Sequence, residues 1–599
     1  MASNNKPIDS LYKSVSYQIK INGTLLPNSY EVKSIETFKE VNKISKASFM
    51  IFGGDHFNNA FDESEDSLFD VGNAVEIQMG YDQKNTIVFE GIIEKHRISI
   101  QEGYTQNKER SALVISCVDK AIALVNNYTT QVYKDKTDQQ IIAALGSSIE
   151  GLQTNIEPTT IEHPVLPKYN CSDWSFILER AKLNGLLVVN SNNVLTLKNP
   201  SLSSYSPQLT ISHGEGTLSF DATLDATHQW QGLELTQVDP FTSEQVSKLA
   251  SNQEGLTASS DSNTSLNPDT DPIQLNISQE IDANELKVIA DALYKYSFLN
   301  RISGQAKFKG VLDIDLDQVI QLEGFGKRFN GEVYLTAVKH EISEGRIYTA
   351  IEFGLKRDLL SSSLNLDLNK LNPPISGLHI GEVIQIDNDP ENQYRIKVIV
   401  PALNETSEGI WARMTHFYTG SESGAFFLPE IGTKVVLAFV SNDPRFPIIM
   451  GSIYSSQQVP EDSPEAENHL KSFVSKSKLK LAFNEEDKSI EISTPNGNSI
   501  MLDESGQEIS ILDENNNSIK LSASGIELQS GGDIKINCGG SMDLSATGQI
   551  QLNANTDLNM NALNISQNAD ANLTAKATAN LELNSSGIST LKGSIVQIN

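Results

Sequence analysis

The sequence predicts a mainly β protein with a few packing helices. Three observations support this fold class: alternating strand patterns in residues 1–360, five short strand-like runs in residues 375–456, and a C-terminal repeat of apolar pairs. At 599 residues the chain is long enough for three or more cores. We assign residues 1–360 to a first region, 375–456 to a second and 476–599 to a third, with linkers at 361–374 and 457–475.

The first region alternates apolar and polar residues, as in VEIQMGY (Val75–Tyr81) and TIVFEGIIEKHRISI (Thr86–Ile100). Such alternation is typical of antiparallel strands with one buried face. One helix is expected to begin at Ser172, whose hydroxyl can accept hydrogen bonds from free backbone amides. A second helix is expected after Asp282, with Glu285 as its capping-box partner.

The second region contains five strand-like runs separated by Gly, Pro, Asn and Asp, which favour turns. Five short strands in about 80 residues are typical of an OB-type barrel. From Gly377 to Ser456 there are five basic and nine acidic residues. The whole chain has 76 Asp and Glu against 46 Lys and Arg. This charge opposes contact with phosphate backbones, so we expect no nucleic-acid partner. The runs are LHIGEVIQI, QYRIKVIV, GIWARM, KVVLAFV and PIIMGSIY.

The third region repeats apolar residues at i and i+2 every eight residues from Ile526/Leu528 to Leu558/Met560, and after a slip Ile565, Leu573 and Leu581 resume the step. Residues two apart share one side of a strand, so each octad is expected to be a short strand with one apolar face, followed by a turn. After Phe483 this region contains no aromatic residue with which to build an ordinary core. The repeat residues, which we predict to form a needle core, are Ile526, Leu528, Ile534, Ile536, Met542, Leu544, Ile550, Leu552, Leu558, Met560, Ile565, Leu573 and Leu581.

Two arrangements would cover this apolar strip: a single-chain solenoid with about three octads per coil, or three chains wrapped into a prism. Periodicity alone does not choose between them. The abundance of Asn, Ser and Ala would also suit a disordered tail, but disorder does not require a regular phase of Ile, Leu and Met. After Pro495 there is also no proline to interrupt strands.

The sequence offers little for catalysis or metal binding. The three cysteines are far apart and the nine histidines are scattered, without a metal-ligand or nucleophile motif. Two acidic pairs, Glu461-Asp462 and Glu465/Glu467, resemble a glycosidase dyad, but in a linker they are expected to be solvated charges. Asp173 and Trp174 are explained by a helix start. We therefore expect no catalytic residue, no cofactor and no metal site.

The order of these parts resembles the VgrG family and the related hub-and-spike proteins of contractile injection systems. The barrel carries the most specific resemblance, in GEVIQIDNDPENQYRIKVIVP, WARM and FFLPEIGTKVVLAFVSNDPRFPIIMGSIY. VFEGIIEKHRIS and YNCSDWSFILERAKLNGL are similar to hub motifs, although Cys171 stands where many relatives have another residue, so it is assigned no function. The resemblance implies a structural spike rather than an enzyme, and it favours the three-chain intertwined β-prism (β-helix).

In such a spike, residues 1–360 are a tube-facing hub of two β-barrel-like domains with helical insertions. The implied partners are two further copies of the chain, inner tube and baseplate proteins at the hub, a PAAR-like tip protein and effector cargo. The target envelope is contacted only transiently. The expected tip-binding platform is Ser594, Ile595, Val596, Gln597, Ile598 and Asn599.

The opening residues, MASNNKPIDSLYKS, lack the apolar stretch of a secretory signal. We therefore expect synthesis and assembly in the bacterial cytoplasm, followed by delivery with the injection particle. A type VI secretion system, a free extracellular particle and a phage tail remain alternatives for the machine. Two other functions also remain open: a cell-wall hydrolase carried on a spike, and a trimeric tail fibre or adhesin.

Overall fold

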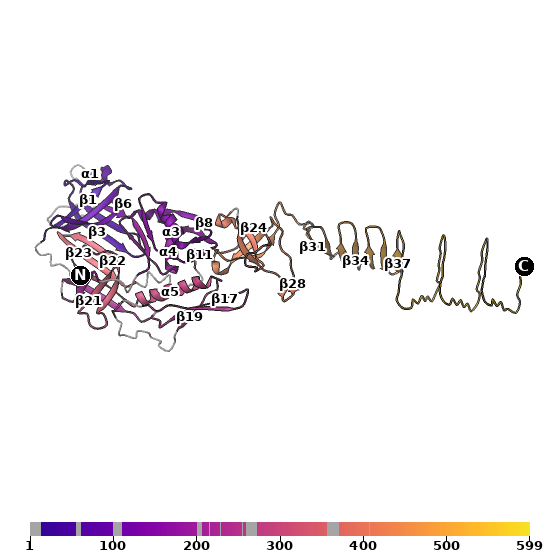
Figure 1. Ribbon diagram of the computed structural model, residues 1–599. Coiled ribbons are helices and arrows are strands. Elements are labelled where there is room, and N and C mark those ends of the chain that lie inside the picture. Colours follow the sequence, from indigo (N-terminus) through magenta and orange to yellow (C-terminus); the bar gives the residue numbers. More distant parts are fainter. Residues whose placement is uncertain are drawn as a thin grey trace. The chain divides into compact units, whose positions relative to one another are not determined.

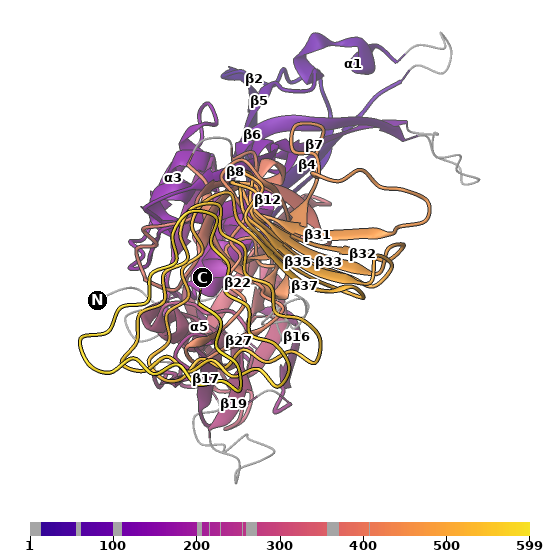
Figure 2. The same cartoon turned by 90° about the vertical axis from the view of Figure 1, so that its right-hand side faces the viewer.

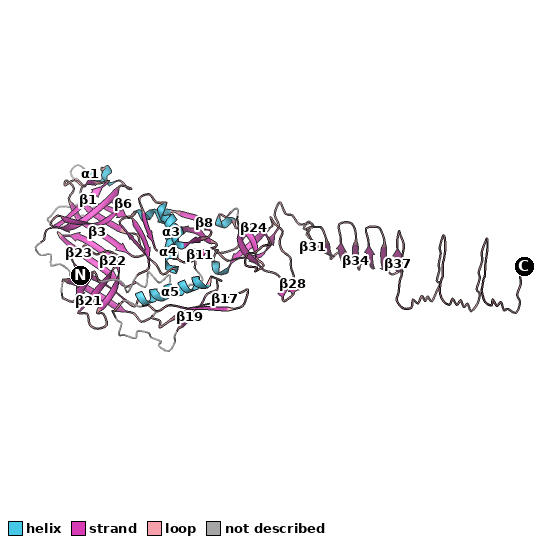
Figure 3. Ribbon diagram, viewed as in Figure 1, coloured by secondary structure: helices cyan, strands magenta, loops and turns pink. Residues whose placement is uncertain are grey.

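The computed structural model describes residues 13–54, 61–99, 111–200, 207–214, 216–227, 229–253, 256–258, 272–355, 371–405 and 408–598. The chain divides into two compact units, residues 1–460 and residues 461–599. Figure 3 shows that the helices belong to the first unit, whereas the described part of the second contains strands and loops. Most of the linker predicted at residues 361–374 lies outside the described residues, which resume at Leu371.

A 13-stranded, mostly antiparallel sheet forms the hub region (Figure 1). The two predicted alternating runs are confirmed as β5 and β6, where Val75, Ile77 and Met79 are buried. The strands are β1 (Val15–Ile21), β2 (Thr24–Leu25), β3 (Val32–Glu40), β4 (Lys46–Phe52), β5 (Ala74–Tyr81), β6 (Lys84–Ser99), β7 (Ala112–Val118), β15 (Leu209–Ser212), β16 (Thr217–Leu224), β20 (Ile302–Lys309), β21 (Val319–Glu323), β22 (Gly331–Ser343) and β23 (Arg346–Phe353).

The long strand β22 joins the two halves of this sheet. It pairs with β3 on one side and with β23 on the other. One core gathers around Phe308 and Phe353, and another around Phe49 and Phe89. The hub thus has more than one core, as expected for its length. Its strands are connected in one sheet through β22, and the division of the hub into two barrel-like domains stays a prediction.

Smaller sheets and helices pack around this framework. The sheets join β10 (Gln153–Ile156), β14 (Val194–Lys198) and β13 (Leu187–Ser191); β9 (Lys136–Thr137) and β11 (Glu162–His163); β8 (Tyr128–Tyr133) and β12 (Leu166–Ser172); and β18 (Gln245–Leu249), β17 (Leu233–Val238) and β19 (Ile273–Asn276). The helices are α1 (Asp62–Glu65), α2 (Ala123–Asn126), α3 (Asp138–Ser147), α4 (Asp173–Leu183) and α5 (Ala283–Leu299), with short 3-10 turns at η1 (Ser67–Phe69), η2 (Lys120–Ile122), η3 (Pro401–Leu403) and η4 (Val440–Asn442).

Both helix starts predicted from the sequence are confirmed. The Ser172 hydroxyl accepts a hydrogen bond from the Ser175 amide, and the Asp282 carboxylate accepts from the Asn284 and Glu285 amides. Helix α5 buries an apolar face that includes Leu286 against β17 and β18. The two helices therefore act as packing elements that also carry polar side chains toward the barrel.

The five runs predicted for the barrel form a closed five-stranded sheet in the order β24-β25-β26-β30-β29. Alternate residues point inward, and Val383, Val398 and Leu437 are fully buried. The parallel pairing of β26 with β30 closes the barrel. A small hairpin, β27 (Thr419–Gly420) with β28 (Ser423–Gly424), lies between β26 and β29. The strands are β24 (His379–Gln385), β25 (Ile396–Ile399), β26 (Ile410–Met414), β29 (Lys434–Phe439) and β30 (Pro447–Ile453).

The second unit opens with a seven-stranded antiparallel meander in which each strand pairs with the next (Figure 2). The meander begins at Leu470, inside the segment predicted as a linker. Its strands are β31 (Leu470–Val474), β32 (Lys480–Asn484), β33 (Ser489–Ser493), β34 (Ser499–Asp503), β35 (Glu508–Leu512), β36 (Ser518–Ser522) and β37 (Gly525–Gln529).

From Ser530 to Ile598 the described chain has no strand. Only the first predicted octad pair, Ile526 and Leu528, lies in a strand, β37. The prediction that each octad forms a strand therefore does not hold for a single chain. The physical reason is that a strand is defined by its hydrogen-bonded neighbour, and these octads have no such neighbour among the described residues of this chain.

Candidate functional site

A chain of buried charged groups links the hub helices to the barrel, and we call it the junction. Its first member, Arg180 of α4, is 1% exposed. The Arg180 Nε donates to Oδ1 of Asp138 at 2.6 Å, and Nη2 donates to Oδ2 at 2.9 Å. The remaining nitrogen, Nη1, donates to Oδ1 of Asn372 at 3.0 Å. One guanidinium thus connects α3 and α4 to the segment that leads into the barrel.

The junction continues from Asn372 to α5. The Asn372 Nδ2 donates to both carboxylate oxygens of Asp443, at 3.2 and 3.1 Å. The Asp443 carboxylate accepts two hydrogen bonds from Arg445, one from Nε and one from Nη2. The third nitrogen of Arg445, Nη1, donates to Oε1 of Glu285 at 2.9 Å. Asp443 and Arg445 belong to the loop between β29 and β30. Opposite charges therefore alternate along a continuous path from the hub to the barrel and back to the hub.

Two members of the junction, Asp138 and Arg445, have a shifted pKa. Burial alone would raise the pKa of the Asp138 carboxyl, but the Arg180 charge and the hydrogen bonds from His163 and Arg180 hold it well below its usual range. Burial likewise opposes the charge on Arg445, yet the nearby Asp443 and Glu285 carboxylates raise its pKa. Asp138 and Arg445 thus remain ionised in the folded protein.

Glu285 corrects one prediction. The sequence places it at the position of a capping-box partner, but its carboxylate accepts from Arg445 of the barrel instead. The cap at Asp282 forms without it. The partners in the junction are 42, 192 and 160 residues apart in sequence. No local motif records such distant pairs, so the sequence alone gave no signal of the junction.

Further contacts surround the junction. Arg413 of β26 reaches Glu280 of the hub at 2.5 Å. Lys134 contacts Glu408 at 2.9 Å and Glu405 at 3.3 Å. At the start of α4, the buried Asp173 pairs with Lys168 and accepts a hydrogen bond from Asn127, and Trp174 is buried. The hub and the barrel are thus held together by several polar contacts within one chain.

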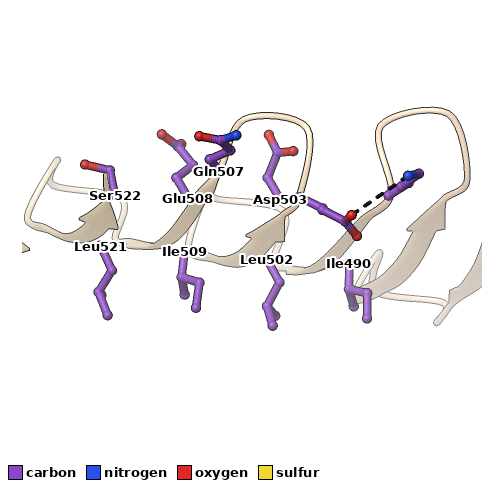
Figure 4. Close-up of a pocket in the computed structure, with 10 residues that line it drawn as sticks. Ile490, Leu502, Asp503, Gln507, Glu508, Ile509, Leu521 and Ser522 are labelled. Atoms are coloured by element: carbon purple, nitrogen blue, oxygen red, sulfur yellow. Dashed lines mark ion pairs between the residues drawn. The ribbon is translucent and has the colours of Figure 1, made fainter. Parts of the chain in front are cut away.

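The meander carries two columns of apolar side chains on one side, which we call the apolar face. Figure 4 shows Ile490, Leu502, Ile509 and Leu521 on the side opposite to Asp503. Cross-strand register aligns the first column through Phe483, Ile490, Leu502, Ile509, Leu521 and Ile526, and the second through Phe473, Leu481, Ile492, Ile500, Ile511, Ile519 and Leu528. All of them except the half-buried Leu481 are exposed, by 36% to 78%.

The predicted needle-core residues are also exposed in the single chain, at 49% to 78%. Their apolar side chains therefore lack a cover within one chain. In the predicted tip platform, Ile595 and Ile598 are 81% and 85% exposed, and Val596 is 46% exposed. Asn599 lies outside the described residues.

The described residues offer little for an active site. Within these ranges, no three His, Cys, Asp or Glu side chains gather closely enough to hold a metal ion. An open hollow of about 500 Å³ lies on the meander, over Lys488 and Glu504, which stand 3.8 Å apart. Glu461 and Asp462, the linker acids, pair with Lys478 and Lys480. None of the helices in the described residues is long and apolar enough to cross a membrane.

Comparison with protein families matches two parts of the chain. Residues 12–344, which are 333 of the 599 residues, match the family described as the Alg8 N-terminal domain. The chain belongs to the Alg8 N-terminal domain family. The description of this family names no reaction. Residues 379–454 match the family described as the type VI secretion system/phage-baseplate injector OB domain. The prediction of an OB-fold barrel is thereby confirmed.

Individual relatives point in the same direction. Over 85 residues the chain is 35% identical to the type VI secretion system spike protein VgrG1a of Pseudomonas aeruginosa and 36% identical to VgrG1b of that organism. Each match covers 14% of this chain, and 13% of VgrG1a and 11% of VgrG1b. The chain thus matches a small part of the length of these curated relatives. The resemblance to VgrG-type spike proteins is confirmed.

A solved structure shows the likeness in fold. A chain of the lidded Francisella PdpA-VgrG complex superposes with a TM-score of 0.50 at 10% identity. The superposition covers 86% of this chain and 80% of that one. The likeness therefore extends well beyond the barrel, and at this low identity it concerns the fold alone.

Proposed function

We propose that this member of the Alg8 N-terminal domain family is the structural central spike of a contractile injection system. Three copies would join an inner tube at the hub to a needle formed by residues 461–599. The barrel match to the injector OB domain family and to VgrG spike proteins supports the general class. The number of chains comes from the resemblance to VgrG-type spikes.

The observation that carries this proposal is the uncovered apolar face of the meander. A soluble monomer rarely leaves a large continuous apolar patch in water, so an ordered row of Ile and Leu indicates an interface. Three copies arranged about an axis would bury the face and leave the other side of the meander in solvent. That other side is mostly polar and includes the ion pair between Glu508 and Lys520, with Met501 and Leu512 among its few apolar residues.

The junction supports the mechanical part of the proposal. A spike must pass force from the tube to its point, which requires that the hub and the barrel do not hinge. Breaking a buried ion pair leaves an unpaired charge in a dry environment, which is costly. The alternating charges from Asp138 to Glu285 would thus keep the hub and the barrel together under load, without any catalytic step.

Native mass spectrometry of the full chain tests the assembly. We expect a mass three times that of one chain at micromolar concentration. A stable monomer would exclude the spike. An assembly of another number would reject the three-chain needle, while leaving an oligomer of unknown role.

The needle end is proposed to bind a separate PAAR-like tip. Ile595, Val596 and Ile598 expose apolar side chains that a cone-shaped partner could cover. Deleting residues 594–599 should leave the trimer intact and abolish capture of the tip protein in a pull-down. Ser594→Ala, which keeps the apolar residues, is the matched control. Capture by the deleted chain at the level of the control would contradict the platform.

The proposal includes cytoplasmic synthesis and later release with the particle, contact with tube and baseplate proteins, and carriage of effector cargo. Purified protein should release no muropeptides from cell walls, whereas a hydrolase would. Binding to whole target cells without the rest of the particle would instead favour a fibre or adhesin. The proposed spike should show neither activity.

A further inference from the structure

The two halves of the second unit satisfy their backbone hydrogen bonds differently. Strands β31 to β37 pair with one another inside one chain, each along a ladder of five residues. From Ser530 to Ile598 the described chain forms no strand (Figures 1 and 3). The meander therefore lacks only a cover for one face, whereas the octads lack both a cover and hydrogen-bonding neighbours.

The occupant of the apolar face is best identified as other copies of the same face. Its thirteen side chains are all Ile, Leu or Phe. The one charged side chain aligned with them, Lys471, lies on the first strand and pairs with Glu485, so the rest of the face offers no charge to a charged partner. It is also continuous with the predicted needle core, because Ile526 and Leu528 belong both to the last strand of the meander and to the first octad. Copies of the chain that cover the octads would therefore also cover the apolar face next to them.

The octads by themselves specify their alignment poorly. Ile534/Ile536, Met542/Leu544, Ile550/Leu552 and Leu558/Met560 follow one another at a constant step of eight. If one chain slides by eight residues, each apolar pair is replaced by a similar pair. A strand register is well specified only where a shift would move apolar side chains into solvent. A shift by eight residues does not do this here, so the repeat distinguishes poorly between alignments.

The meander does not share this weakness. Its strands from β32 onward begin at residues 480, 489, 499, 508, 518 and 525, so the spacing varies from nine or ten to seven. This variation lies in the turns, whereas the docking face carries its own landmark, because Lys471 of β31 is aligned with the first apolar column at Phe483. A slip by one strand would bring the Lys471 charge of one copy against Phe483 of another, which is costly. Its pairings are also between neighbours in sequence, and such local contacts form faster than long-range ones.

We propose that Leu470–Gln529 is a register-setting segment of the needle. It folds within each chain, and three copies dock through the apolar face before the octads pair between chains. Docking aligns the three chains and raises the effective concentration of the octads for one another. This inference rests on the proposed trimer, but it adds which part of the needle determines the alignment.

The chain provides a reporter of alignment in Cys538, which is exposed and lies just after the meander, whereas Cys117 is buried. In a Cys171→Ser background, a nitroxide spin label is attached to Cys538 and distances between labels are measured by pulsed electron paramagnetic resonance on the full chain. Aligned copies give a single distance, and slipped copies add others.

Three variants distinguish the contribution of the meander to alignment from that of the octads. Ile511→Asp places a charge on the apolar face, Ser510→Asp places the same charge on the other side of the same strand, and Ile550→Asp places it in an octad. We expect Ile511→Asp to lose the single distance, either through additional distances or through at least a tenfold loss of trimer. Ser510→Asp, outside the apolar face, should keep the trimer and the single distance. Ile550→Asp should weaken the octads around it but keep the single distance at Cys538 and lose much less trimer than Ile511→Asp.

Ile511→Ser, which adds no charge, guards against a variant that merely fails to fold, and circular dichroism checks that its strands remain. It should show the same defect more weakly. A single distance in an intact trimer of Ile511→Asp would overturn the inference, as would dissociation of Ile550→Asp to the same extent. If the unaltered chain is monomeric, the proposed trimer itself is wrong, which is a separate outcome.

Discussion

The junction and the meander differ in which side chains they bury within a single chain. In the junction, Arg180 and Arg445 meet their carboxylate partners inside one chain and are almost fully buried. In the meander, ion pairs such as Glu508 with Lys520 lie in solvent, and apolar side chains such as Ile500 are exposed. The first unit therefore covers these groups within a single chain, whereas the second leaves apolar side chains uncovered, which the proposed trimer would bury. The following experiments test this difference.

The largest effect is expected from Arg180→Ala. This change leaves the buried Asp138 carboxylate without its main partner, and loss of one member of a buried pair costs about 3–5 kcal/mol. The midpoint of denaturant unfolding of the first unit should fall accordingly. In the needle, Lys520→Ala removes an exposed charge and should leave unfolding unchanged. Equal effects of the two changes would remove the distinction between junction and needle.

A second experiment compares two isoleucines. Ile396 of the barrel is fully buried within its own chain, whereas Ile519 of the meander is 38% exposed. Ile396→Ala should cost about 2–5 kcal/mol at any protein concentration, because its core is intramolecular. Ile519→Ala should instead lower the melting temperature more at low protein concentration than at high, because its core forms by association. Thermal melts across a hundredfold dilution series provide the measurement.

If Ile519→Ala is independent of concentration, the meander is not an interface between copies. The same dilution series on Ile396→Ala serves as the control, since its loss should stay constant. Ser510→Ala, on the other side of β35, should behave like the unaltered chain.

A third experiment uses pH, to which the two units should respond differently. Burial and then the Lys39 charge lower the pKa of His340 in the hub to about 4. Because the folded pKa is depressed, the unfolded chain binds the proton first, so this stability is complete above pH 6.5 and is lost as pH falls toward 4. From pH 7 to 5 the hub should lose about 2 kcal/mol. No histidine occurs in residues 470–599.

Chemical denaturation at pH 7, 6 and 5 measures this loss, with tryptophan fluorescence as the signal. All three tryptophans, Trp174, Trp230 and Trp411, belong to the first unit. His340→Gln cannot take up a proton and should flatten the dependence between pH 7 and 5. An equally steep dependence in that variant would assign the effect to other groups.

The sequence predicted those features whose causes are local. The barrel strands follow from alternation and turn residues, and the starts of α4 and α5 follow from Ser172 and Asp282. The junction could not be predicted, because Glu285 finds Arg445 only after the chain has folded. The meander was not predicted for a different reason. Its strands begin nine or ten residues apart, with a last step of seven, so they do not follow the step of eight that marks the octads.

The smallest effect concerns the helix that carries Glu285 to the junction. Asp282 caps α5 by accepting hydrogen bonds from the Asn284 and Glu285 amides. Asp282→Ala should cost about 1 kcal/mol, and Asp282→Asn, which caps nearly as well, should cost much less. Combined with Arg445→Ala, the loss from Asp282→Ala should fall short of the sum, because the cap helps to position Glu285 for a partner that is then absent. Strict additivity in this double-mutant cycle would mean that α5 supports the hub core but does not serve the junction.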